Sequence, residues 1–154
     1  LDACYPAGVA CFCGVQALYL LRIRRAGGWP PPVCLALRCG LAALGLICAG
    51  ALNALTPLTA LALLYFSQLL CNGLESLSLR PRGAGARLFS AGLLLFLGCD
   101  LCVGLHNLSG LLPSPLPAAL TSFAAVGMWL FYLPSQVLIT LSGRWDLSPK
   151  GGTS

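Results

Sequence analysis

The side chain in this sequence best suited to chemistry is the carboxyl group of Asp100. It lies in the apolar run of residues 93–105, and no other acidic residue falls inside a long hydrophobic segment. A carboxylate in hydrocarbon is costly unless it is partnered or protonated, so such residues commonly mark functional sites. Surroundings of low polarity favour the neutral acid, and a neutral acid can act as a general acid catalyst. Asp100 is therefore our candidate catalytic residue.

Neutral polar side chains in the apolar runs are candidates to surround this acid. Lipid offers no hydrogen bonds, so these side chains should face other helices. Several of them share a helix face, because they are spaced three, four or seven residues apart. Each alone could be a simple hydrogen bond between helices, worth about 0.6 kcal/mol. The candidates for orienting water or substrate are Gln16, Tyr19, Tyr65, Gln68, Tyr132, Ser135 and Gln136, and Asn53 and Asn72 are of the same kind.

The remaining reactive side chains do not complete a familiar site. The nine cysteines lie almost entirely in the apolar runs, where cysteine is a small packing residue. Cys99 and Cys102 have the spacing of a metal or redox pair, but no second pair or nearby histidine completes a site. The single histidine, His106, lies outside the runs, so no Ser-His-Asp set is available. We expect neither a metal nor a cofactor.

The elements that position these groups are predicted to be transmembrane helices. The chain has 154 residues, of which 58% are hydrophobic and 8% charged, whereas soluble domains carry about 25% charged residues. Five apolar runs are long enough, or nearly so, to cross about 30 Å of hydrocarbon as helices. We therefore predict an all-α, polytopic transmembrane bundle, forming one domain over residues 1–154. The spans are expected at residues 7–23, 33–55, 58–74, 88–105 and 118–142, with a polar, glycine-rich loop from Glu75 to Arg87.

The distribution of charge predicts how the bundle is oriented. The net charge is +5, and with five spans all nine basic residues fall on one side of the membrane. This includes Arg38, near the start of the second span, whose long side chain could extend back to the surface. Positive loops are cytoplasmic, so we expect the N-terminus outside and the C-terminus in the cytoplasm. The positive charge thus indicates topology and not a nucleic-acid partner.

Three segments of the chain resemble the YhhN-like lysoplasmalogenase family, integral membrane proteins with about eight helices. Residues 94–100 (Leu-Leu-Phe-Leu-Gly-Cys-Asp) resemble that family's apolar run ending in Ser-Asp. Residues 132–139 (Tyr-Leu-Pro-Ser-Gln-Val-Leu-Ile) resemble its final helix. Residues 8–19 resemble a family helix with Gly, Phe, His and Tyr at that spacing. Here Gln16 stands where histidine is usual, and Cys99 where serine is usual.

The resemblance implies a function and a position in a longer fold. The chain would correspond to the fourth through eighth helices, and the helices before it would supply a second carboxylate. Such enzymes cleave the vinyl ether of a lysoplasmalogen, a lysophospholipid within the bilayer, to a fatty aldehyde and a glycerophospho-alcohol. Asp100 would be the acid or its partner, and the neutral polar set would orient water and substrate. We expect an integral protein of a bacterial plasma membrane.

Two other interpretations stay open. The chain could be a fragment of a transporter in which Asp100 relays a proton or binds a solute. It could also be an inactive membrane scaffold, since the usual histidine is replaced by Gln16. Along ideal helices, Asp100 lies in the outer half of the membrane and Gln136 in the inner half. Helix tilt or a kink at Pro134 would have to bring these two residues together.

Overall fold

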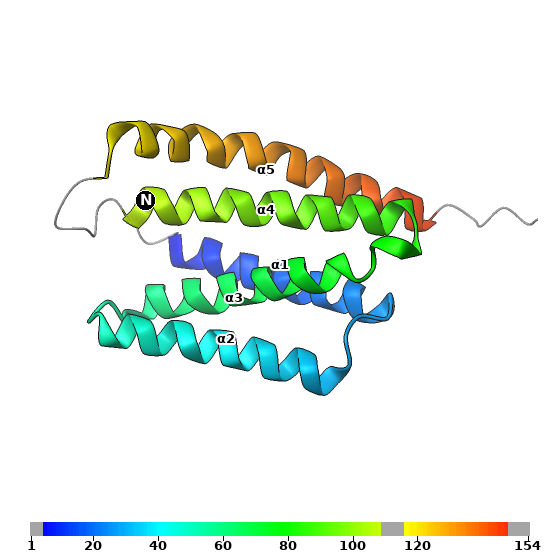
Figure 1. Ribbon diagram of the computed structural model, residues 1–154, viewed down its shortest axis with the longest axis horizontal. Coiled ribbons are helices and arrows are strands. Elements are labelled where there is room, and N and C mark those ends of the chain that lie inside the picture. The colour runs from blue at the N-terminus through cyan, green and yellow to red at the C-terminus, as the bar shows by residue number, and fades with distance from the viewer. Residues whose placement is uncertain (1–4, 109–115, 148–154) are drawn as a thin grey trace, which may run out of the picture. The chain divides into compact units, whose positions relative to one another are not determined.

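The computed structural model describes residues 5–108 and 116–147, and this part of the chain is helical, with no strand. It contains five helices that are long and apolar enough to cross a membrane, which confirms the predicted all-α, membrane-spanning fold (Figure 1). The helices are α1 (Tyr5–Arg25), α2 (Pro31–Ala51), α3 (Pro57–Leu77), α4 (Ala84–Leu108) and α5 (Ala118–Leu147), and the short 3-10 helix η2 (Arg80–Arg82) precedes α4.

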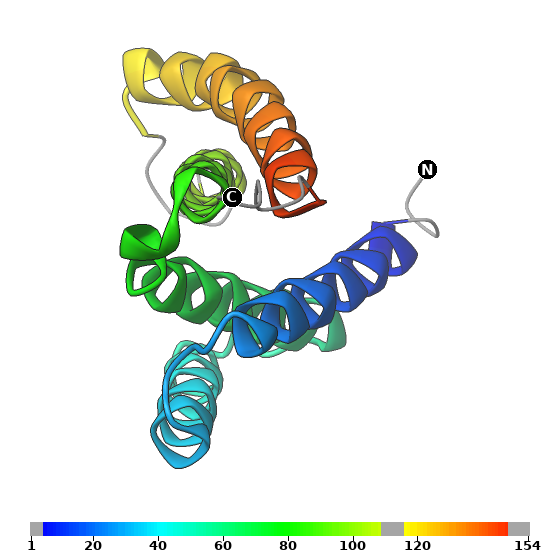
Figure 2. The same cartoon turned by 90° about the vertical axis from the view of Figure 1, so that its right-hand side faces the viewer.

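The helices form two compact units, Leu1–Leu79 and Arg80–Ser154, and each is described by itself. In the first unit, α3 lies between α1 and α2 and packs against both (Figure 2). In the second unit, α4 and α5 lie side by side along their lengths, and η2 packs against α4 (Figure 1). The central helix α3 is therefore the element through which the first unit can hold polar groups away from lipid.

The turn between α2 and α3 is set by local chemistry. Helix α2 ends at Ala51, four residues before the predicted end, because Asn53 adopts a left-handed conformation with φ of 54°. Its amide donates to Gly50 O at 3.0 Å, and that of Ala54 to Ala49 O at 2.9 Å, a common way to close a helix. Asn53 is thus an exposed turn residue and not a polar group of the span.

The start of α3 is capped by a side chain, and its end lies further along the chain than the sequence predicts. Thr56 caps its start by accepting a hydrogen bond from Thr59 N at 3.1 Å, and Pro57 follows at the first helical position. Its end lies at Leu77, three residues beyond the predicted end, so Glu75 belongs to the helix and not to a loop. Both predictions that depended on this boundary are wrong: the loop does not start at Glu75, and Asp100 is not the only acid in an apolar segment.

Small residues allow α4 and α5 to approach closely. A Cβ atom on Gly92 would lie 2.6 Å from Ile139 Cγ1 and 3.0 Å from Ser135 O, so only glycine fits there without a shift. Pro134 lies inside α5 and does not end it. The two helices run antiparallel, with Gly92 beside Ser135 and Ile139, Gly98 beside Phe131, and Cys102 beside Gly127.

Candidate functional site

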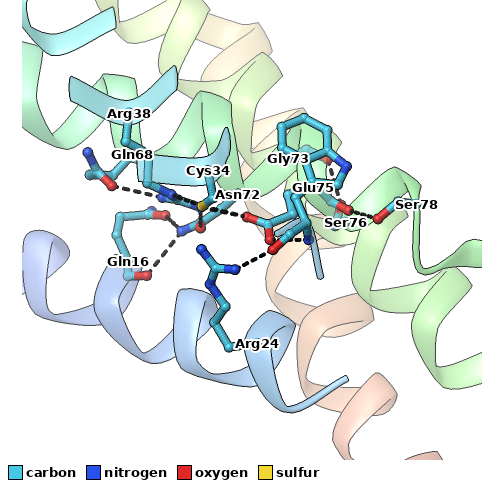
Figure 3. A network of polar contacts seen from close by, with 11 residues as sticks. Gln16, Arg24, Cys34, Arg38, Gln68, Asn72, Gly73, Glu75, Ser76 and Ser78 are labelled. Carbon is cyan, nitrogen blue, oxygen red and sulfur yellow. Dashed lines mark hydrogen bonds and ion pairs between the residues drawn. The ribbon is translucent and has the colours of Figure 1, made fainter. Parts of the chain in front are cut away.

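A buried guanidinium group lies at the centre of the first unit. Arg38 is only 6% exposed, and Figure 3 shows it reaching from α2 toward α3. It is not an exposed side chain, because four acceptors hold it inside the unit. It donates from Nε to Cys34 Sγ (2.9 Å), from Nη1 to Gln68 Oε1 (2.8 Å), and from Nη2 to Asn72 Oδ1 (2.7 Å) and Glu75 Oε2 (3.0 Å). We call these residues, with Gln16, the Arg38 network.

The carboxylate of Glu75 balances this charge. It is fully buried, and its Oε2 atom forms the ion pair with Arg38 at 3.0 Å. The thiol of Cys34 donates to the same oxygen at 3.3 Å, and Oε1 accepts from the backbone N–H of Trp29 at 2.8 Å. A buried carboxylate is tolerable when it is paired and its remaining lone pairs are filled, as they are here. Glu75 thus connects α3 to α2 and to the segment between α1 and α2.

That segment approaches Glu75 closely enough to require a glycine. A Cβ atom on Gly28 would overlap Glu75 Oε1 and would lie 2.7 Å from Ile23 Cγ2. Arg24, in the last turn of α1, donates to Trp29 O. The backbone at Trp29 is therefore held through both its N–H and its carbonyl group, one by an acid and the other by a base.

Gln16 joins α1 to the network. Its side chain is 1% exposed, and Asn72 Nδ2 donates to both Gln16 Oε1 (2.8 Å) and Gln16 O (3.0 Å). Gln16 Nε2 is buried and has no hydrogen-bond partner within residues 5–108 and 116–147. The network therefore spans all three helices of the first unit, and Gln16 Nε2 is its fully buried donor without a partner in the described part of the chain.

Two of the predicted tyrosines lie in the same unit. Tyr65 is half-buried, and its ring packs against that of Phe12 with centroids 5.9 Å apart. Tyr19 is half-buried on α1, one turn beyond Gln16. Of the four candidates in this unit, the hydrogen bonds bring Gln16 and Gln68 together through Arg38 and Asn72.

The second unit holds Asp100 and the other three candidates. Asp100 is half-buried on α4, and Phe96 lies one turn before it on the same face of the helix. The ring of Tyr132 packs edge-on against Phe96 at 6.1 Å, and that of Trp129 packs against Tyr132 at 6.5 Å. Tyr132 thus lies about one helical turn from the level of Asp100.

Ser135 and Gln136 lie at a different level of this helix pair. Ser135 is buried and donates to Tyr132 O at 2.7 Å, while Gln136 Nε2 donates to Ser135 Oγ at 3.3 Å. Ser135 lies beside Gly92, which is eight residues, or about 12 Å of helix, from Asp100. The proline in α5 therefore does not bring Gln136 to the level of Asp100.

Sequence reasoning missed the two charged members of the network. The sequence places Arg38 in the second span but predicts that its side chain extends back to the surface, and it places Glu75 in a loop, although Glu75 lies in a helix of transmembrane length. A signal was present: Tyr65, Gln68 and Asn72 define a polar face of α3, and Glu75 continues it at the next helical spacing. A polar face that ends in an acid predicts a basic partner on a neighbouring helix.

Known proteins add nothing to this geometry. Comparisons with protein-family models, with curated proteins and with solved structures find no match to this chain. Among the residues that the structure describes, no group of three or more His, Cys, Asp or Glu side chains could hold a metal ion. The relation to the lysoplasmalogenase family stays a prediction based on the three segments that resemble it.

Proposed function

We propose that this protein is an integral membrane hydrolase of the lysoplasmalogenase type. It would cleave the vinyl ether bond of a lysoplasmalogen to a fatty aldehyde and a glycerophospho-alcohol. The observation that supports this most directly is Asp100, a half-buried carboxyl group within an apolar helix of transmembrane length. An ionisable group in that position is a functional group by default, and the residues around it resemble the family's motif.

The reaction needs a proton donor and a water molecule. Asp100 would protonate the alkenyl carbon next to the ether-bearing carbon, which gives an oxocarbenium ion. Water adds to this ion and returns a proton to the carboxylate. The resulting hemiacetal then collapses to the aldehyde and the free alcohol, so the acid is regenerated. Tyr132, one turn away, would help to position the substrate.

The surroundings of Asp100 suit a long hydrocarbon chain. The rings of Phe96, Tyr132 and Trp129 follow one another along α4 and α5, and aromatic rings offer large apolar surfaces for contact. A lysoplasmalogen has one such chain and is already dissolved in the bilayer. It could reach Asp100 sideways from the lipid, without entering from water.

The test is aldehyde release by the complete protein in detergent with a lysoplasmalogen substrate. We expect Asp100→Asn to lower the rate by about 100-fold or more, because the amide cannot supply the proton. His106→Asn is a control on the same helix, since His106 is exposed near its end. Undiminished release by Asp100→Asn would remove Asp100 from the mechanism, and no release by the unaltered protein would refute the hydrolase.

A second candidate function is transport, and the Arg38 network is the observation that favours it. Charged side chains buried between membrane helices often line ion or proton pathways. In this case the protein in sealed vesicles should carry protons or a solute across the membrane. A pH-sensitive dye inside the vesicles measures proton flux. Glu75→Gln should abolish the flux if the Arg38 network lines the pathway, and Asp100→Asn should abolish it if Asp100 relays the proton. Vesicles that show no flux, made with protein that cleaves lysoplasmalogen, would reject this alternative.

A further inference from the structure

The Arg38 network determines the orientation of the side-chain amides of Asn72 and Gln16. An arginine side chain has only donors, so the atom of Asn72 that faces Arg38 Nη2 at 2.7 Å must be the acceptor Oδ1. The donor Nδ2 of Asn72 then faces Gln16 and finds two acceptors there, O at 3.0 Å and Oε1 at 2.8 Å. The charge of Arg38 therefore determines the orientation of the Gln16 amide, through Asn72.

This orientation leaves Gln16 Nε2 as a buried donor. It has no acceptor among the residues that the structure describes, and an unsatisfied buried donor costs about 1–3 kcal/mol. Turning the amide over would not remove the cost, because Nε2 would then face the donor Nδ2 of Asn72. The donor is thus kept available by the network itself, and the acceptor has to come from elsewhere.

We propose that Gln16 Nε2 is a binding group for a neutral acceptor oxygen in the membrane, held in place by Asn72 and Arg38 as positioning residues. The oxygen belongs to an ether lysophospholipid (its hydroxyl or ether oxygen) or to an ordered water molecule. The naming of these two sources rests on the proposed function, whereas the existence of the site does not.

The charge balance of the Arg38 network determines which kind of ligand oxygen Gln16 Nε2 can bind. Arg38 is neutralised by Glu75 at 3.0 Å, and its Nε and Nη2 groups already donate to Cys34, Asn72 and Glu75. The network's buried donor without a partner among the described residues, Gln16 Nε2, is a neutral amide and not a free cation. A phosphate or carboxylate is bound best by charged donors, so a hydroxyl, ether or water oxygen is the better fit.

Two substitutions test the site without assuming catalysis. The probe is a lysophosphatidylethanolamine with a saturated alkyl ether chain, which cannot be cleaved, titrated into the complete protein in detergent. If the lipid supplies the oxygen, Gln16→Leu should weaken probe binding by about three- to tenfold, the value of one hydrogen bond. Asn72→Asp should weaken it as much although Gln16 is intact, because the new carboxylate draws Nε2 inward and turns Oε1 toward the ligand.

Asn53→Asp is the matched control for the second substitution. Asn53 is an exposed turn residue with φ of 54°, a conformation that aspartate also tolerates. The same chemical change there should leave probe binding unchanged.

A third substitution should give a pH dependence of binding that a purely structural role of Gln16 would not produce. Gln16→Glu keeps the shape, and its carboxylate still accepts from Asn72 Nδ2, but its second oxygen is an acceptor and repels the ligand oxygen. At low pH the protonated acid becomes a donor again. Binding by Gln16→Glu should therefore recover as the pH falls, while binding by the unaltered protein should not show this recovery.

Two further measurements distinguish the source of the oxygen. A water molecule at the site would leave probe binding unchanged in Gln16→Leu, lower kcat by about three- to tenfold and leave KM unchanged. An experimental structure of the complex with the probe shows the source directly: a lipid oxygen or an ordered water within hydrogen-bond distance of Gln16 Nε2. A hydrocarbon chain there, or an acceptor from another part of the same protein, would overturn the proposal.

The proposal and the proposed function can fail separately. Hydrolysis that is unaffected by both Gln16→Leu and Asn72→Asp, with probe binding also unaffected, overturns the site and leaves the hydrolase standing. Probe binding that depends on Gln16 and Asn72 in a protein that cleaves no lysoplasmalogen supports the site and refutes the hydrolase.

Discussion

Arg38 and Glu75 act as one unit at the scale of single residues. Each would be prohibitively costly alone in the interior of the first unit, and together they satisfy one another at 3.0 Å. Their positions are 37 residues apart in the chain. The stability that they provide is therefore conditional, because removing one partner leaves the other as a buried, unpaired charge.

Because each charge depends on the other, we expect the effects of substituting Arg38 and Glu75 on the free energy of unfolding to be non-additive. Arg38→Met and Glu75→Leu should each lower the free energy of unfolding by about 3–5 kcal/mol, whereas the double variant should lose much less than the sum. Intrinsic tryptophan fluorescence during heating in detergent measures the apparent Tm of each protein. Strictly additive losses would show that the two side chains do not stabilise each other.

At the scale of elements, the pairing of α4 with α5 decides which candidates can act with Asp100. Small residues set the register, and the register places Tyr132 near the level of Asp100 and Ser135 about two turns away. A site around Asp100 therefore draws on the part of α5 before Pro134. Gln136 donates instead to Ser135, which lies beside Gly92.

A cross-link tests this register. A Cβ atom on Gly127 would lie 3.0 Å from Cys102 Sγ, a separation compatible with a disulfide between neighbouring helices. Gly127→Cys should form a disulfide with Cys102 under mild oxidation, detected by mass spectrometry of the linked peptides. The same substitution in a Cys102→Ser background is the control, and Gly104→Cys should form no such bond, since that position faces open space. Failure of Gly127→Cys to cross-link would contradict the register.

At the scale of the whole molecule, the orientation in the membrane remains a prediction from charge. Arg22, Arg24 and Arg25 lie in the last turn of α1, and Arg80, Arg82 and Arg87 lie between the end of α3 and the first turn of α4. Positive segments at helix ends are cytoplasmic. The Arg38 network would then lie toward the cytoplasmic side, because Glu75 is near the end of α3 and contacts the segment after α1.

Fusions to the C-terminus test the orientation. A fluorescent protein that folds only in the cytoplasm should be fluorescent when fused to the C-terminus. Alkaline phosphatase, which is active only in the periplasm, should be inactive at the same position. Expression of each fusion is checked by immunoblot. An active phosphatase fusion with a dark fluorescent fusion would reverse the predicted topology.

The number, order and approximate limits of the helices could be predicted from the sequence. The free energy of transfer of an apolar run from water to lipid depends only on the residues within that run. The errors came from residues whose environment depends on other residues. Glu75 was assigned to a loop because an isolated acid ends an apolar run. Helix α2 was extended to residue 55 because the local turn at Asn53 leaves no trace in hydropathy.

The sequence by itself determined that this is a helical membrane protein with a carboxyl group at Asp100 in an apolar segment. Only the tertiary structure decided that a second carboxylate, Glu75, is also buried, that Arg38 is its partner, and that Gln16 Nε2 is a buried donor without a partner among the described residues. The physical reason is that hydropathy is a property of one residue at a time. The partners that make a buried charge stable come from different helices and meet only when the helices pack.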